Sequence, residues 1–262
     1  MPEIVIKNVS VEFPADSKKR EPVLALTDVN VTVRDQEFVC LLGPSGCGKS
    51  TLLNLIAGFL EPTEGSIEVG GKEILAPSTD RGVVFQDANL FPWLTVGKNI
   101  AFGPSVNPDF DKKQLAQSVD AYLDRVGLTE FKNHLPMELS GGMRQRVSLA
   151  RVLINDPPIL LMDEPFGALD AQTRIIMQEL LLELWERDRK TVVFVTHDID
   201  EALLLADRIY VMTTRPGRIH DSVEVPLGRP RSYEMTNDPT FRDLRFKLFQ
   251  QLHKDALVEV VS

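Results

Sequence analysis

Cysteine is scarce in this sequence of 262 residues, which contains Cys40 and Cys47 and no others. Two cysteines so close together cannot form a disulfide framework, and they lack the spacing of zinc ligands. Their scarcity argues against a small secreted domain and against a zinc module. We therefore expect a reducing, cytoplasmic setting.

Long hydrophobic runs and a signal sequence are also missing. No apolar run approaches the roughly 18 residues that cross a bilayer. The first residues lack the basic and apolar regions of a secretory signal. We expect any membrane association to depend on a partner protein.

Positive charge is not in excess either, since 38 acidic residues outnumber 29 basic ones and give a net charge of -9. Such a chain lacks the basic footprint with which proteins bind nucleic acid, so we expect no nucleic acid partner. No internal repeat is visible, which favours one functional unit over a tandem pair.

What the sequence does contain is a regular alternation of short β-rich runs and helical patterns. Its 43% of hydrophobic residues suffice for a sizeable core. Strands that alternate with helices predict an α/β fold with a mostly parallel sheet covered on both faces. The expected strands are Glu3–Phe13, Val29–Val33, Glu37–Leu42, Gly82–Phe85, Ile159–Met162, Thr191–Thr196 and Arg208–Met212. The expected helices are Ser50–Gly58, Leu115–Val126, Met143–Asn155, Ala171–Arg189, Ile199–Ala206 and Phe241–Leu257.

The middle of the chain differs in pattern from this α/β core. Residues 87–108 are rich in proline and aromatic residues and predict an irregular segment, whereas Asp111 to Asn155 show helical patterns. We therefore predict an α/β core at residues 1–87 and 158–225 and an inserted helical subdomain at residues 88–157. Residues 226–262 form a C-terminal extension that is mostly helical, for which the sequence suggests no chemical role.

A glycine-rich segment joins an expected strand to an expected helix and matches the phosphate-loop pattern G-x-x-x-x-G-K-[ST]. Its glycines let backbone N–H groups converge on phosphate oxygens, and the helix N-terminus adds its positive dipole at the same place. We expect Lys49 to reach the β- and γ-phosphates and Ser50 to ligate Mg²⁺, while Cys47 is a small filler. The predicted ATP-binding residues of the loop are Gly43, Pro44, Ser45, Gly46, Cys47, Gly48, Lys49, Ser50 and Thr51.

Two carboxylates follow the buried run Ile159–Met162 at the edge of the sheet where α/β proteins bind ligands. An apolar strand that ends in an acidic residue is by itself a weak signal, but here it follows a phosphate loop. We expect Asp163 to hold the Mg²⁺ hydration shell. Glu164 is predicted to polarise the water that attacks the γ-phosphate.

Two further polar residues follow the ends of expected strands. His197 follows Thr191–Thr196, and we interpret it as a donor to the γ-phosphate that also orients the attacking water, although a lone histidine could equally cap the strand. Gln86 follows Gly82–Phe85, and its amide is expected to contact the metal or the water.

A second anion-binding pattern lies at the start of the helix near Met143. Ser140, Gly141 and Gly142 at a helix N-terminus resemble a phosphate site, although an ordinary N-cap followed by a glycine turn explains them as well. One chain with two such sites needs either two ligands or one ligand shared between two copies of the chain.

Taken together, these motifs resemble those of the ABC transporter ATPases. The resemblance covers residues 4–225 and includes the phosphate loop, the Asp163 strand, Gln86, His197 and the segment from Leu139 to Gln145. It implies a RecA-like P-loop NTPase core with an N-terminal antiparallel β portion and an inserted α-helical subdomain. It also implies ATP and Mg²⁺ as cofactors and a head-to-tail dimer, either of two copies or with a second ATPase subunit.

In such a dimer each ATP lies between the phosphate loop of one chain and the signature segment of the other. The signature residues that act in trans would be Ser140, Gly141, Gly142 and Gln145. By the same resemblance Asp170 lies at the dimer seam, and Phe13 stacks on the adenine, although a phenylalanine at a strand end is usually part of a core. The further partners are integral membrane permease subunits and a periplasmic or lipid-anchored solute-binding protein, which places the chain at the cytoplasmic face of the cell membrane.

Three functions compete at this stage. An unrelated phosphate-loop kinase or GTPase should lack the signature segment, and a soluble ABC protein of DNA repair or translation should carry a coiled-coil insertion or a second cassette. The sequence contains the signature segment and shows neither a coiled-coil insertion nor a second cassette, which favours a transporter motor. The segments 82–103 and 196–219 resemble the nitrate, sulfonate and taurine importers, while motors for amino acids or polyamines remain alternatives.

Overall fold

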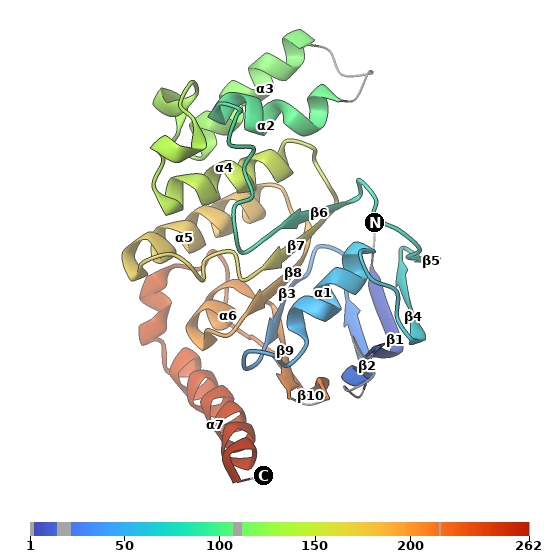
Figure 1. Cartoon of the computed structure of the whole chain (residues 1–262). Helices are drawn as coiled ribbons and strands as arrows, with labels where there is room; N and C mark the ends of the chain where they lie inside the picture. The colour runs from blue at the N-terminus through green and yellow to red at the C-terminus, as the bar shows by residue number, and fades with distance from the viewer. Residues whose placement is uncertain (1–2, 15–21, 107–111, 215, 262) are drawn as a thin grey trace.

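The computed structural model describes residues 3–14, 22–106, 112–214 and 216–261, which form two β-sheets with helices around them (Figure 1). The larger sheet has the order β10-β9-β3-β8-β7-β6, parallel from β9 to β6, with β10 antiparallel at one edge. Its strands are β3 Phe38–Leu42, β6 Arg81–Val84, β7 Ile159–Asp163, β8 Thr191–Thr196, β9 Arg208–Thr213 and β10 Arg218–Glu224. The smaller sheet is antiparallel, in the order β2 Val23–Val33, β1 Ile4–Phe13, β4 Glu64–Val69 and β5 Lys72–Glu73.

The parallel sheet is covered on both faces. Every residue of β3 is buried, and its side chains alternate between two cores. Phe38 and Cys40 lie in the core with α5 Ala171–Arg187 and α6 Ile199–Leu205. Val39 lies in the other core, which includes α1 Lys49–Ala57 and the antiparallel sheet. Burial on both faces explains the continuous apolar runs of these strands, and the predicted α/β class is confirmed.

The helices between β6 and β7 pack around a third core, which includes Val96, Ile100, Leu123 and Val147. These helices are α2 Val96–Ser105, α3 Lys112–Arg125 and α4 Gly141–Leu153, with 3₁₀ turns at Thr129–Phe131 and Pro136–Glu138. The division of the chain into domains stays a prediction.

The prediction of an irregular segment at residues 87–108 is wrong at its C-terminal part. Thr95 caps helix α2 by accepting the Lys98 amide, and Val96 and Ile100 bury one face of the helix. Proline at position 104 falls in the last turn and misled the sequence analysis. Asp111, the expected start of the helical patterns, lies outside the described residues.

Strands β4, β5 and β10 were not predicted from the sequence, and β2 begins six residues before the expected Val29. In β4 and β10 most positions are polar and few side chains are buried, so neither segment carries a clear apolar pattern. None of the helices in the described ranges is long and apolar enough to cross a membrane.

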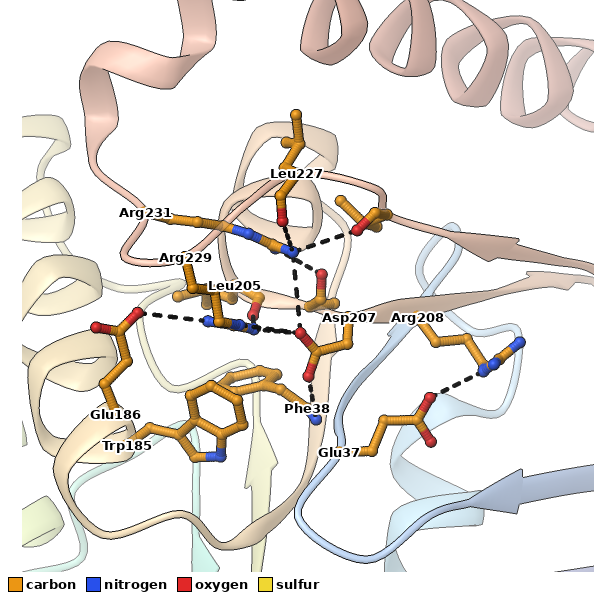
Figure 2. Close-up of polar contacts among 12 residues, drawn as sticks. Glu37, Phe38, Trp185, Glu186, Leu205, Asp207, Arg208, Leu227, Arg229 and Arg231 are labelled. Carbon is orange, nitrogen blue, oxygen red and sulfur yellow. Dashed lines mark hydrogen bonds and ion pairs between the residues drawn. The ribbon is translucent and has the colours of Figure 1, made fainter.

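The C-terminal extension is attached to the core by two arginines that flank Pro230 (Figure 2). Arg229 donates to Asp207 from Nη2 at 2.7 Å, and its guanidinium lies 4.1 Å from the Trp185 ring centre. Arg231 is 6% exposed and donates hydrogen bonds to the backbone carbonyls of Ala206 and Leu227. Burial lowers the pKa of Arg231 to about 10, so the guanidinium is still charged near neutral pH, and the carbonyls compensate its lost hydration. Helix α7, Pro239–Val261, then packs against α6.

Candidate functional site

The glycine-rich loop between β3 and α1 borders a cavity of about 850 Å³. Gly48 caps α1 in a left-handed conformation with φ of 94°, and a Cβ atom there would come within 2.5 Å of Leu26. Glycine is therefore required at this position. The cavity is lined by Pro22, Val23, Leu24, Ala25, Ser45, Gly46, Gly48, Lys49, Ser50, Thr51, Gln86, Glu164 and Pro216.

Lys49 lies at the centre of the loop and is almost completely buried, with 4% of its surface exposed. Its Nζ donates to the carbonyls of Gly43 and Pro44, each at 2.8 Å, and lies 3.9 Å from Oε1 of Glu164. A buried ammonium beside left-handed glycines supplies the positive charge that phosphate oxygens need. Cys47 is fully buried in the core next to the antiparallel sheet, which agrees with a filler role.

The residues predicted to hold the metal lie together. Ser50 at the start of α1 donates its hydroxyl to Oδ1 of Asp163 at the end of β7, at 2.8 Å. Burial raises the pKa of Asp163, and the hydrogen bond from Ser50 opposes this shift. Hydroxyl and carboxylate oxygens are the donors that Mg²⁺ prefers, and it commonly combines one such carboxylate with substrate phosphates. The residues present therefore fit a magnesium ion.

Glu164 and His197 form the other polar pair of the site. Nδ1 of His197 lies 3.0 Å from Oε2 of Glu164. Glu164 has a positive φ of 42°, and its amide donates to the carbonyl of Val195 at 3.0 Å. An uncommon backbone conformation in a carboxylate beside a phosphate loop is typical of a functional residue.

Gln86 is among the residues that line the same cavity. Strand β6 ends at Val84, so Gln86 lies in the loop after it and not at its last residue. Gln145, predicted to act in trans, is 4% exposed and donates to the carbonyl of Phe85 at 3.3 Å. It therefore joins the signature helix to the Gln86 loop of its own chain.

The signature residues lie at the start of α4. Ser140 caps the helix by accepting the Met143 amide, and the helix begins at Gly141, two residues before the expected start. A Cβ atom on Gly142 would come within 2.4 Å of Thr173 at the start of α5, so glycine allows the two helices to approach closely. Among the residues described, none of the signature serine and glycines lines the phosphate-loop cavity.

Asp170 and Phe13 were predicted from the resemblance. Asp170 caps α5 by accepting the Thr173 amide at 3.0 Å, and this hydrogen bond lowers the pKa of its carboxyl. Phe13 is 39% exposed and is therefore not a core residue. The strand partner of Phe13, Val23, lines the cavity. Phe13 itself is not among the described residues that line it.

The sequence analysis missed a buried cluster behind His197. Glu201 on α6 accepts hydrogen bonds from the Thr196 hydroxyl and from the Gln178 amide, the latter at 3.0 Å. The sequence signal that could have identified this cluster is Glu201 itself, a glutamate within the apolar pattern of the short helix α6. The sequence analysis also did not identify the cavity wall formed by Val23 and Pro216.

Comparison with known proteins shows which family this chain resembles. A family model described as ABC transporter matches residues 26–167. The taurine import ATP-binding protein of Pelagibacter ubique is 50% identical over 87% of this chain and 85% of its own length. The nitrate import ATP-binding protein of Synechococcus elongatus is 47% identical over 90% of this chain and 87% of its own length.

The fold has close counterparts among solved structures. A dimeric post-hydrolysis state of an ATP-binding cassette, bound to ADP and Pi, matches with a TM-score of 0.74 and 34% identity, over 86% of this chain and all of that chain. These findings confirm the predicted fold and the predicted ATPase activity. The chain belongs to the ABC transporter family, as one of its ATP-binding and ATP-hydrolysing subunits.

Proposed function

We propose that this ATPase is the motor of an importer for a small oxyanion, and that it hydrolyses ATP at the cavity of the phosphate loop. The observation that carries the catalytic assignment is the convergence of Lys49, Glu164 and His197 from three different elements. Glu164 lies 3.9 Å from the buried cation Lys49 and 3.0 Å from the imidazole of His197, and the three groups supply phosphate binding, water activation and transition-state stabilisation.

Each residue has a distinct role in this proposal. The loop amides and Lys49 bind the phosphates, and Ser50 with Asp163 would hold the Mg²⁺ ion, which neutralises phosphate charge when bound. Glu164 accepts a proton from the attacking water. His197 orients the water and donates to the γ-phosphate, while Gln86 contacts the water or the metal from the opposite side of the cavity.

The signature segment completes the site from a second chain. Ser140, Gly141 and Gly142 do not line the cavity of their own chain, but their helix N-terminus can bind the phosphates of a nucleotide held by a partner. Asp170 lies next to them because α4 and α5 meet at Gly142 and Thr173. This arrangement supports a head-to-tail dimer of two copies, or of this chain with a second ATPase subunit.

A groove beside the Gln86 loop supports docking of a permease subunit. It has a volume of about 440 Å³ and a mostly apolar lining. Its aromatic and basic residues include Phe85, Phe91, Phe102 and Arg151, and Trp93 nearby is 74% exposed. An exposed aromatic groove of this kind suits an amphipathic helix of a membrane protein. The proposal therefore places the chain at the cytoplasmic face of the membrane, with a solute-binding protein on the other side.

The cargo is inferred from the relatives and not from a binding residue. Taurine and nitrate import ATP-binding proteins are among the relatives of this chain, and both solutes are small and present oxygen atoms of an oxyanion group. Part of the sequence resemblance, at Arg215, lies outside the described residues. A soluble ABC ATPase that is not coupled to transport is the alternative, and the groove beside Gln86 argues against it.

Replacement of Glu164 by glutamine tests the catalytic assignment. The amide cannot accept the proton of water, but it leaves Lys49 and the loop unchanged. We expect ATP turnover at least about 100-fold lower, with unchanged ATP binding and an ATP-bound dimer on size exclusion. Glu130→Gln, an exposed carboxylate in the helical region, is the matched control. Turnover near the wild-type rate in Glu164→Gln would refute the assignment.

A further inference from the structure

The position of His197 depends on the backbone that carries it. Its side chain is 56% exposed, so packing does little to hold the ring. The residue lies between the last residue of β8, Thr196, and the N-cap of α6, Asp198. Contacts that hold Thr196 and Asp198 in place therefore also position the imidazole relative to Glu164.

A buried cluster of hydrogen bonds with Glu201 of α6 holds Thr196 and Asp198 in place. Thr196 and Glu201 are 2% and 5% exposed, and the Thr196 hydroxyl donates to the Glu201 carboxylate. The same hydroxyl accepts the Asp198 amide at 3.0 Å, and Oδ1 of Asp198 accepts the Glu201 amide at 3.1 Å. Gln178 of α5 holds the second oxygen of Glu201. The strand end is thus coupled to the position of α6.

Helix α6 has seven residues and is held at its other end by the C-terminal extension (Figure 2). Nη1 of Arg231 donates to the carbonyls of Leu203 at 3.1 Å and Ala206 at 2.6 Å, which are among the last carbonyls of the helix. Nη2 of Arg229 donates to Leu205 at 2.8 Å. These guanidiniums satisfy carbonyls that a helix C-terminus leaves unpaired.

Helix α7 of the extension also reaches the N-terminal end of α6. Nε of Arg245 lies 2.8 Å from Oδ1 of Asp200. A cavity of about 600 Å³ has His197 and Asp198 on one wall and α7 residues such as Phe246 on the other. The extension therefore contacts both ends of the short helix that follows the catalytic histidine.

We propose that the C-terminal extension is a positioning element for ATP hydrolysis, in which Arg231 holds α6 and the α6 residue Glu201 holds the strand end that carries His197. The inference rests on the proposed role of His197. It assigns a function to residues 226–262, which lie beyond the segment matched by the family model.

The first test separates the effect of the Thr196 hydroxyl from the effect of the shape of the side chain. Thr196→Val keeps the volume and the β-branch but removes the hydrogen bonds to Glu201 and Asp198, whereas Thr196→Ser keeps the hydroxyl. In the full chain we expect Thr196→Val to lower kcat at least about fivefold, since the loss of one buried hydrogen bond alone has about this effect and two are lost, with KM for ATP changed less than about twofold. Thr196→Ser should retain the wild-type kcat.

The second test addresses the extension. Arg231→Met should lower kcat to a similar degree, because it frees the carbonyl end of α6. Arg208→Met is the matched control, since Arg208 forms ion pairs with Glu37 and Glu224 but makes none of the α6 contacts. If Arg231→Met does not fold, Arg231→Lys, which keeps the charge but reaches fewer carbonyls, replaces it.

A spectroscopic readout distinguishes positioning from general damage. The chain has four histidines, so histidine-labelled protein gives few imidazole NMR signals, and His197→Ala identifies that of His197. Thr196→Val and Arg231→Met should each shift or broaden this signal while leaving that of His134, in the helical region, unchanged. An unmoved His197 signal, or a wild-type kcat, in folded Arg231→Met protein would overturn the inference. Wild-type turnover of His197→Ala would instead refute the proposed role of His197 itself.

Discussion

At the scale of single residues, the site depends on a lysine whose charge is buried. The hydrogen bonds of Lys49 at 2.8 Å go to two neutral carbonyls of the loop, and its ion-pair partner Glu164 lies farther away, at 3.9 Å. Burial of an ammonium in this way is costly unless an anionic ligand compensates it. Lys49 therefore identifies the loop as an anion site more strongly than the glycines do.

Lys49→Ala should weaken ATP binding about 100-fold, because a charge-assisted contact to the β- and γ-phosphates is lost. Isothermal titration calorimetry of the purified chain measures this directly. Lys72→Ala removes an exposed lysine of the β5 edge and should leave the affinity unchanged. Equal affinities in Lys49→Ala and wild type would count against the loop as the nucleotide site.

At the scale of elements, helix α7 has side chains that are buried in the core and others that are exposed. Phe241 is 1% exposed and belongs to the core with α6, whereas Phe246 on the same helix is 62% exposed. Leu248 is fully buried. The part of α7 that carries Phe241 and Leu248 is therefore packed into the core that includes α6.

The two phenylalanines of α7 provide a matched pair for a stability measurement. Phe241→Ala should lower the free energy of unfolding by about 3 kcal/mol, since it deletes a fully buried aromatic side chain. Phe246→Ala should change it by less than about 0.5 kcal/mol. Urea denaturation of the full chain checks both values. Equal effects of the two substitutions would show that α7 does not pack as described.

At the scale of the whole molecule, the proposed dimer can be tested by mixing inactive chains. Ser140→Arg blocks the signature segment and Lys49→Ala blocks the loop, so a mixed dimer keeps one intact composite site. Equal mixing should restore about a quarter of wild-type turnover, because half of the dimers are mixed and each has one of two sites. A chain with both substitutions, mixed with Ser140→Arg, should restore nothing. Absence of recovery in demonstrated mixed dimers of the single variants contradicts the shared site.

Transport coupling also belongs to the whole molecule. Cargo delivered by the binding protein should favour closure of the ATP dimer through the permease and the groove beside Gln86. In the complex reconstituted in lipid, taurine, an alkanesulfonate or nitrate should stimulate ATP turnover several-fold over maltose, spermidine or amino acids. Stimulation by a sugar or a polyamine alone would overturn the proposed cargo and leave the motor assignment standing.

The sequence by itself determined the family of the chain and most of the α/β core, and it predicted the chemistry of the site. The phosphate-loop glycines, Lys49 and the carboxylates at the end of β7 are local patterns, because a strand, a tight turn and a helix N-terminus are specified by neighbouring residues. The expected strand Thr191–Thr196 agrees with β8 at both ends for the same reason. The ATPase family followed from these motifs and their order.

Only the tertiary structure decided which distant residues support the site. Helix α2 was missed because its stability comes from burial of Val96 and Ile100 in the third core and not from its local pattern. Glu201 and Arg231 carry no motif, and their partners are carbonyls and hydroxyls that chain folding brings to them. Hydrogen bonds between distant segments depend on the three-dimensional path of the chain, and a local sequence pattern does not record that path.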